Sequence, residues 1–231
     1  MSLVTPAVLP ASRKELTEKL ALFASIPAVS RVQIDVVDGC FASPPSWPYN
    51  AGSSLQVAAG REMLPHLGRL EYEIDLMCVD AEVAMEAWLA LGATRLTLHA
   101  ESVIDLPRLL AFIRDRYGDF ISLGLALSVA SELALIERCL EGIAYVQFMG
   151  IARIGRQGQP LDPRVFKKVR IFHTRHPEIP IQVDGGISLQ NAKKLLAAGA
   201  SNLVVGSGIL KAKDPAAAVA AFEALESPFG V

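Results

Sequence analysis

Acidic side chains stand at the ends of predicted strands, where a parallel barrel would bring them to one face. Gln33 and Asp35 are two residues apart in one apolar run, so both side chains point to the same side of that strand. Asp75 lies at the matching place in the next run, and Asp184 ends a late one. Buried carboxylates are costly without partners, so these three suggest acid/base chemistry or a cation site. The structural alternative is that they cap turns or pair with arginine.

Asp35 and Asp184 form the pair with the clearest chemical use. Their strands are the second and seventh of eight, three steps apart around a ring, so their side chains should face each other across the barrel mouth. Two acids on opposite faces of one carbon can move protons in both directions if one is ionised and the other protonated. We therefore predict Asp35 and Asp184 as the catalytic residues.

Glycines after the last two predicted strands give a second signal. Gly185 and Gly186 follow the seventh strand, and Gly206 and Ser207 follow the eighth. In barrels these two loops commonly bind phosphate through backbone N–H groups and a helix N-terminus. Glycine also serves ordinary turns, but its presence in both loops favours a phosphate site at these four residues.

Three other features have a functional and a structural interpretation. His99 ends the fourth strand and either touches substrate or is a hydrogen-bonded wall residue. The basic loop 150–159 either closes over an anion or is simply solvated. The loop 38–54 begins with Asp38, a predicted turn residue, and contains prolines, Trp47 and an aromatic neighbour. It predicts a lid or a contact with a second copy in a homo-oligomer.

The elements that must position these residues repeat one pattern, a short apolar run followed by an amphipathic stretch. Mostly apolar strands with helices between them are typical of a parallel sheet covered by helices. Residues 1–231 are therefore predicted to form a single α/β domain, a (β/α)8 TIM barrel, with an open doubly wound sheet as the rival. The predicted strands are 5–9, 32–37, 72–77, 95–99, 122–127, 145–149, 181–183 and 203–205, and the predicted helices are 13–24, 57–66, 81–91, 106–117, 131–140, 163–175, 189–198 and 215–225.

Composition narrows the class of protein. The formal net charge is −2, so no electrostatic attraction to nucleic acid or to an anionic membrane is expected. No apolar run is long enough to span a bilayer, and the first residues do not resemble a signal peptide. Three scattered cysteines indicate reduced thiols, so we expect a cytoplasmic protein whose partner is a small molecule.

The run from Ile34 to Phe41 resembles the strand-2 motif of ribulose-phosphate 3-epimerases. Further stretches match along nearly the whole chain, at 98–101, 124–127, 155–159, 183–187 and 205–207. The resemblance implies a ribulose-phosphate-binding barrel that inverts C3 of a ketopentose 5-phosphate through an enediolate. The family's two aspartates fall on Asp35 and Asp184, and its phosphate contacts fall on the region of Gly158, Gly186, Gly206 and Ser207. We add His99, Met149 and Gly158 as predicted substrate-binding residues.

The chain departs from this family where the family binds a divalent metal through two histidines and two aspartates. Gln33 and Asp75 stand at the histidine positions, and 151–153 replaces the Asn-Pro-Gly of the sixth loop. The remaining candidates, Gln33, Asp35, Asp75 and Asp184, offer only oxygen, which suits magnesium or manganese better than zinc. The sequence therefore predicts either a hard divalent ion or no metal, with Arg153 or Arg156 stabilising the enediolate in its absence.

We interpret the chain as an epimerase-like isomerase acting on a phosphorylated ketose. One alternative is a lyase of the related hexulose-phosphate synthase and decarboxylase group, which carries an Asp-x-Lys-x-x-Asp array on strand 3. The run 75–80 keeps both aspartates but has methionine in place of the lysine, which argues against it. The other alternative is a barrel that binds a sugar phosphate without turning it over.

Overall fold

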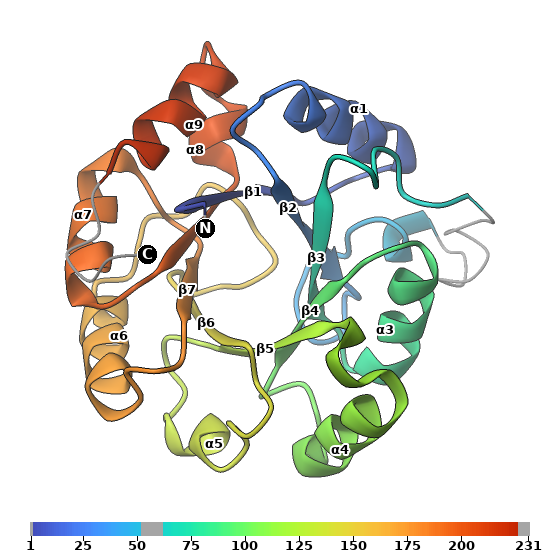
Figure 1. The fold of residues 1–231 in the computed structure, drawn as a ribbon, viewed down its shortest axis with the longest axis vertical. Helices are drawn as coiled ribbons and strands as arrows, with labels where there is room; N and C mark the ends of the chain where they lie inside the picture. Colours follow the sequence, from blue (N-terminus) through green and yellow to red (C-terminus); the bar gives the residue numbers. More distant parts are fainter. Residues whose placement is uncertain (1, 52–61, 226–231) are drawn as a thin grey trace.

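Eight parallel strands close into a barrel in the order of the sequence, and β8 pairs with β1 to complete the ring (Figure 1). The computed structural model describes residues 2–51 and 62–225. Ring closure confirms the predicted TIM barrel and excludes the open sheet. The strands are β1 (Val4–Val8), β2 (Arg31–Val37), β3 (Glu71–Met77), β4 (Arg95–His99), β5 (Ser122–Leu127), β6 (Tyr145–Met149), β7 (Ile181–Asp184) and β8 (Asn202–Val205).

Helices surround the barrel and cover its outer face (Figure 1). Outward strand residues such as Val32, Ile34 and Val36 are completely buried beneath them. Among the described residues, no helix is both long and apolar enough to span a lipid bilayer. The helices are α1 (Arg13–Ala24), α3 (Ala81–Ala90), α4 (Leu106–Tyr117), α5 (Ala134–Glu137), α6 (Arg164–Arg175), α7 (Leu189–Ala198), α8 (Ser207–Leu210) and α9 (Pro215–Glu223), with 3-10 turns η1 (Tyr49–Ala51) and η2 (Gly118–Phe120).

Short polar side chains begin most of these helices. Ser12, Asp80, Asp105 and Asp214 each accept a hydrogen bond from the backbone N–H three residues later. Such caps satisfy N–H groups that the helix itself leaves without partners. At the other end, α7 stops at Gly199, whose φ of 116° is left-handed and suits glycine. Local sequence therefore sets where each βα loop ends.

Two predicted helices differ from the structure. The prediction over 57–66 falls partly outside the described residues, and over 62–66 it is wrong because those residues are not helical. Pro65 lacks an N–H donor, and the N–H of Leu64 donates to the carbonyl of Leu91 instead. The helix predicted over 131–140 is confined to α5, whose N-cap residue Leu133 makes no side-chain capping bond.

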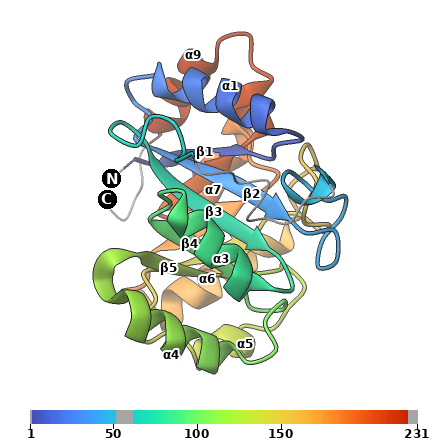
Figure 2. The ribbon, with the colours of Figure 1, turned by 90° about the vertical axis from the view of Figure 1, so that its right-hand side faces the viewer.

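The inner face of the barrel is polar, in contrast to its outer face. Inward residues such as Gln33, Glu73, Thr97, Gln147 and Gln182 are almost completely buried. At the carboxyl ends of the strands, the loops after β2 and β6 lie side by side (Figure 2), joined by a hydrogen bond from Arg156 Nε to the carbonyl of Ser43. The polar interior and this loop-covered end are where we look for a site.

Candidate active site

Three buried aspartates meet at the carboxyl end of the barrel. Asp35 and Asp75 are paired in register on β2 and β3, and Asp184 reaches them from β7. One carboxylate oxygen from each lies within 4.8 Å of the other two. Gln33 links the predicted pair, since its Nε2 donates to Asp35 Oδ1 at 2.8 Å and to Asp184 Oδ2 at 3.2 Å. The structure thus brings together the two acids that the sequence singled out.

This crowding changes the acidity of the pair. Burial raises the pKa of Asp35 to about 8, and the charge of Asp75 adds to the shift, while hydrogen bonds from Gln33 and Gln157 oppose it. Burial also raises the pKa of Asp184 well above its ordinary value, and the charges of Asp35 and Asp75 add to it. Because two carboxylates this close cannot easily ionise together, the pair retains a proton at neutral pH.

Asp75 has partners of its own. Its Oδ1 lies 3.0 Å from Nε2 of His99, and its Oδ2 accepts a hydrogen bond from Gln147 Nε2 at 3.1 Å. Burial lowers the pKa of His99, but the charge of Asp75 and its hydrogen bond outweigh this, so the His99 pKa is raised overall. His99 is fully buried, with the ring of Phe41 5.2 Å away. The structure therefore places His99 in the wall, behind Asp75, and direct contact with substrate stays a prediction.

A layer of glutamine amides lies beneath the aspartates, and the sequence analysis missed most of it. Gln182 Nε2 donates to Gln147 Oε1 at 2.7 Å and to Gln33 Oε1 at 3.2 Å, and it also donates to Glu73. Gln182 lies two residues before Asp184, as Gln33 lies two residues before Asp35. This repeated Gln-x-Asp spacing is the signal that could have revealed the layer, because it puts both side chains on the inner face.

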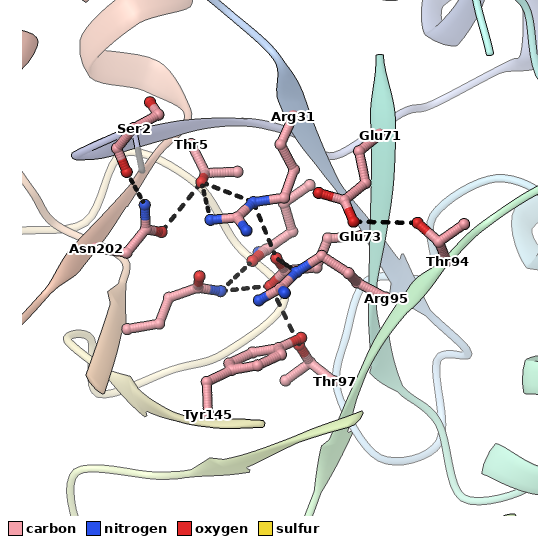
Figure 3. Close-up of polar contacts among 12 residues, drawn as sticks. Ser2, Thr5, Arg31, Glu71, Glu73, Thr94, Arg95, Thr97, Tyr145 and Asn202 are labelled. Atoms are coloured by element: carbon pink, nitrogen blue, oxygen red, sulfur yellow. Dashed lines mark hydrogen bonds and ion pairs between the residues drawn. The ribbon is translucent and has the colours of Figure 1, made fainter. Parts of the chain in front are cut away.

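Glu73 anchors this layer at the amino end of the barrel (Figure 3). Its Oε2 lies 3.0 Å from Arg95 Nε and 3.5 Å from Arg31 Nε, and its carboxylate is completely buried. The guanidinium of Arg95 lies 4.3 Å above the ring of Tyr145. Two cations around one carboxylate satisfy its charge, so we assign this cluster to stabilising the barrel interior rather than to chemistry.

A cavity opens above the aspartates, between the loops after β6, β7 and β8. Asp35 and Asp184 line it together with predicted phosphate and substrate residues, and neither Asp75 nor His99 is among its lining residues. The acid pair and the glycine loops therefore share one cavity, as a phosphorylated substrate would require. Its lining includes Met77, Met149, Ile151, Arg156, Gln157, Gly158, Gly185, Gly186, Gly206 and Ser207.

The glycines in these loops are structurally demanding. Gly185 and Gly186 have φ values of 98° and 72°, a left-handed region that favours glycine. A Cβ atom on Gly186 would lie 2.6 Å from the backbone of Leu161. Gly206 precedes α8, which begins at Ser207, so backbone N–H groups from both loops border the cavity. Close backbone packing is the physical reason for glycine here, and phosphate binding stays a prediction.

The loop after β6 contributes a residue that the sequence analysis did not single out. Gln157 lines the cavity, and its Nε2 would lie only 2.6 Å from a Cβ on Gly206. Gln157 is also close enough to Asp35 to lower its pKa. Of the two arginines predicted for this loop, Arg156 lines the cavity and Arg153 is not among its lining residues.

The loop after β2 is packed within its own chain. Trp47 is 6% exposed and lies edge-on to Trp88, with ring centroids 5.9 Å apart, so it does not form a surface patch. Asp38 accepts hydrogen bonds from the backbone N–H groups of Cys40 and Val79, which agrees with its predicted turn role. The described part of this loop therefore borders the mouth beside the loop after β6, and the predicted homo-oligomer stays a prediction.

The acid cluster is a poor match for a divalent cation despite its spacing. Oxygens within 4.8 Å of one another could surround a small ion. However, amide nitrogens of Gln33 and Gln147 contact all three aspartates, and the oxygen of Gln33 is turned away toward Gln182. Metals bind amides through oxygen, so a donor N–H occupies the place where the family resemblance requires a ligand.

Comparison with known proteins gives a consistent result. The profile of the ribulose-phosphate 3 epimerase family matches residues 3–210. Ribulose-phosphate 3-epimerase of Aquifex aeolicus is 28% identical over 187 residues, covering 78% of this chain and 77% of that protein. The chloroplastic ribulose-5-phosphate-3-epimerase of Arabidopsis thaliana is 28% identical over 99% of this chain and 79% of its own length. The Synechocystis ribulose-phosphate 3-epimerase is 29% identical, with coverage of 94% and 91%.

Solved structures share the fold at lower identity. KGPDC from Streptococcus mutans superimposes with a TM-score of 0.66 at 18% identity, covering 96% of each chain. The same protein solved in complex with a phosphorylated sugar gives 0.64 at 18% identity, with coverage of 96% and 95%. The 3-hexulose-6-phosphate synthase from Salmonella typhimurium gives 0.65 at 17% identity, with coverage of 96% and 97%. These likenesses establish the barrel fold alone.

Proposed function

This chain belongs to the ribulose-phosphate 3 epimerase family, and we propose that it inverts a carbon of a phosphorylated ketose by proton transfer between two aspartates. The observation that carries the proposal is the pairing of Asp35 and Asp184 through one amide of Gln33, in the same cavity as the glycine loops. Pairs of acids whose pKa values are pushed apart are typical of general acid/base sites.

The two acids divide the work according to their acidity. Asp35, with its pKa raised to about 8, ionises first and acts as the base that removes the proton next to the carbonyl. The product of that step is an enediolate, whose electrons return to the carbon when Asp184 delivers a proton from the opposite face. Since Asp184 holds its proton more firmly, it starts as the acid, and the roles reverse in the opposite direction.

The substrate class follows from the other end of the cavity. Gly186, Gly206 and Ser207 offer backbone N–H groups and a hydroxyl to an oxyanion, which suits a phosphate ester. Relatives of this chain are named for ribulose phosphate, and a structural neighbour was solved with a phosphorylated sugar bound. We therefore propose ribulose 5-phosphate or a close analogue as substrate, with Arg156 near enough to the mouth to stabilise developing negative charge.

The cavity argues against the lyase alternative. A lysine on strand 3 would bring an amine to the position of Met77, which lines the cavity here with a thioether. A thioether cannot supply the positive charge that such an array would use. A barrel that only binds a sugar phosphate remains the alternative that an assay must separate.

Turnover of ribulose 5-phosphate to xylulose 5-phosphate tests the proposal. Asp35→Asn and Asp184→Asn should each lower kcat by about 10²- to 10⁴-fold, because each removes one proton-transfer group. Asp38→Asn is the matched control, since it makes the same change outside the acid cluster. Near-normal turnover in either cluster variant would refute the acid/base assignment, and binding without turnover in the unmodified protein would favour the binding alternative.

A further inference from the structure

A continuous path of hydrogen bonds runs along the barrel axis from Glu73 to the acid cluster. Gln182 contacts Glu73 and also donates to the oxygens of Gln33 and Gln147. Gln33 in turn donates to Asp35 and to Asp184. Every one of these side chains except the two acids at the mouth is at most 2% exposed, so water cannot substitute for a missing partner.

Glu73 fixes the direction of this path. A carboxylate between two guanidinium groups can only accept hydrogen bonds, so the Gln182 amide must turn its nitrogen toward it. The reverse orientation would press the oxygen of Gln182 against the buried charge of Glu73, which is strongly unfavourable. The two hydrogens of Gln182 are then shared between Glu73 and the oxygens of Gln33 and Gln147.

The orientation of Gln182 determines what the next layer presents to the aspartates. Because Gln33 and Gln147 use their oxygens to accept from Gln182, their nitrogens face the carboxylates. Gln33 reaches two of them, at 2.8 and 3.2 Å, and Gln147 donates to the third, Asp75, at 3.1 Å. Amide nitrogen has no lone pair available to a metal, so each carboxylate meets a donor instead of a second ligand.

The third carboxylate also has a counter-charge inside the protein. Asp75 lies 3.0 Å from Nε2 of His99, and both side chains are completely buried. A protonated imidazole there balances the charge that a cation would otherwise balance. All three members of the acid cluster are thus supplied with hydrogen-bond donors by the chain itself.

We infer that Glu73 is a positioning residue which, through Gln182, turns the amide donors of Gln33 and Gln147 toward the aspartates and so excludes a divalent cation from the acid cluster. The inference rests on the proposed function only in treating these aspartates as the working acids. Amide orientation and metal affinity are properties of the free protein, so they can be measured without any substrate.

The test is a Mn²⁺ titration of the purified protein, with unbound Mn²⁺ followed by electron paramagnetic resonance. Gln182→Met keeps the side-chain volume but removes the donor that orients Gln33 and Gln147. Gln33→Glu replaces the amide donor by a carboxylate of the same shape. Gln190→Glu, at an exposed position on α7, adds the same charge far from the cluster and is the matched control.

We expect the unmodified protein and Gln190→Glu to bind Mn²⁺ equally weakly. Gln182→Met should bind about 10- to 100-fold more tightly, the range that outer-sphere hydrogen-bond partners typically control, and Gln33→Glu should bind at least as tightly as that. Tight stoichiometric binding by the unmodified protein would overturn the inference. So would a folded Gln182→Met whose affinity is unchanged, and if that variant does not fold, the comparison of Gln33→Glu with the unmodified protein decides.

Discussion

Replacing Asp35 by asparagine should stabilise the folded protein at neutral and alkaline pH. Burial and the neighbouring Asp75 raise the pKa of Asp35 from 3.8 to about 8 in the folded state. The unfolded chain therefore releases this proton first, and the free energy of unfolding falls as the pH rises from about 4 to about 8. Asparagine does not titrate, so the variant escapes that loss.

The size of the effect follows from the width of this pH window. At 1.36 kcal/mol per pKa unit, a shift of about four units corresponds to about 6 kcal/mol above pH 8. Asp35 titrates together with Asp184, which ionises more easily once its neighbour is neutral, and this recovers part of the difference. We therefore expect a gain of about 2–4 kcal/mol at pH 8 and about 1 kcal/mol at pH 5.

Urea denaturation at pH 5 and pH 8 measures both values. Asp38→Asn is the control, because the Asp38 carboxylate accepts backbone hydrogen bonds from Cys40, Phe41 and Val79. Asparagine has only one oxygen, so this variant should lose about 1–3 kcal/mol. An Asp35→Asn protein that is less stable than the unmodified protein at pH 8, or that gains equally at both pH values, would refute the reasoning.

Three further predictions concern catalysis and the cavity. The value of kcat/KM should rise with pH up to about 8, because the base is the ionised form of Asp35, and a profile that is flat from pH 5 to pH 9 would contradict this. Gly186→Ala should lower stability by about 1–3 kcal/mol and raise KM, since it places a Cβ against the backbone of Leu161 at a left-handed φ; unchanged urea midpoint and KM would argue against a demanding cup. Gln157→Ala should lower KM about fivefold, because its amide packs against Gly206 where we place the phosphate and losing about 1 kcal/mol of competing contact favours the ligand. A higher KM in steady-state assays would instead make Gln157 a substrate ligand.

The barrel and the meeting of its acids could be predicted from sequence because both follow from short-range rules. Alternation along β2 put Gln33 and Asp35 on one face, and parallel strands end at one rim, so Asp184 had to lie near them. The predicted strands agree with the structure to within one residue at nearly every end.

The amide layer was harder to predict, because its partners come from strands far apart in the sequence. Gln147 and Gln182 are 35 residues apart, and each could equally have been an ordinary polar strand residue. The position of Gln157 depends on how the loop after β6 folds back over the mouth, which no local pattern specifies. Likewise, the burial of Trp47 depends on its contact with Trp88, so composition alone suggested a lid or an interface instead.

The central claim is that Asp35 and Asp184 move protons on opposite faces of one carbon, and deuterium exchange tests it most directly. Ribulose 5-phosphate is incubated with the protein in D₂O, and the C3 proton is followed by NMR. The account predicts that the unmodified protein incorporates deuterium at C3 of both epimers. Asp184→Asn, which keeps the base, should exchange this proton in the substrate without forming the epimer. If the unmodified protein binds the sugar phosphate and leaves its C3 proton unexchanged, the two-aspartate account is wrong.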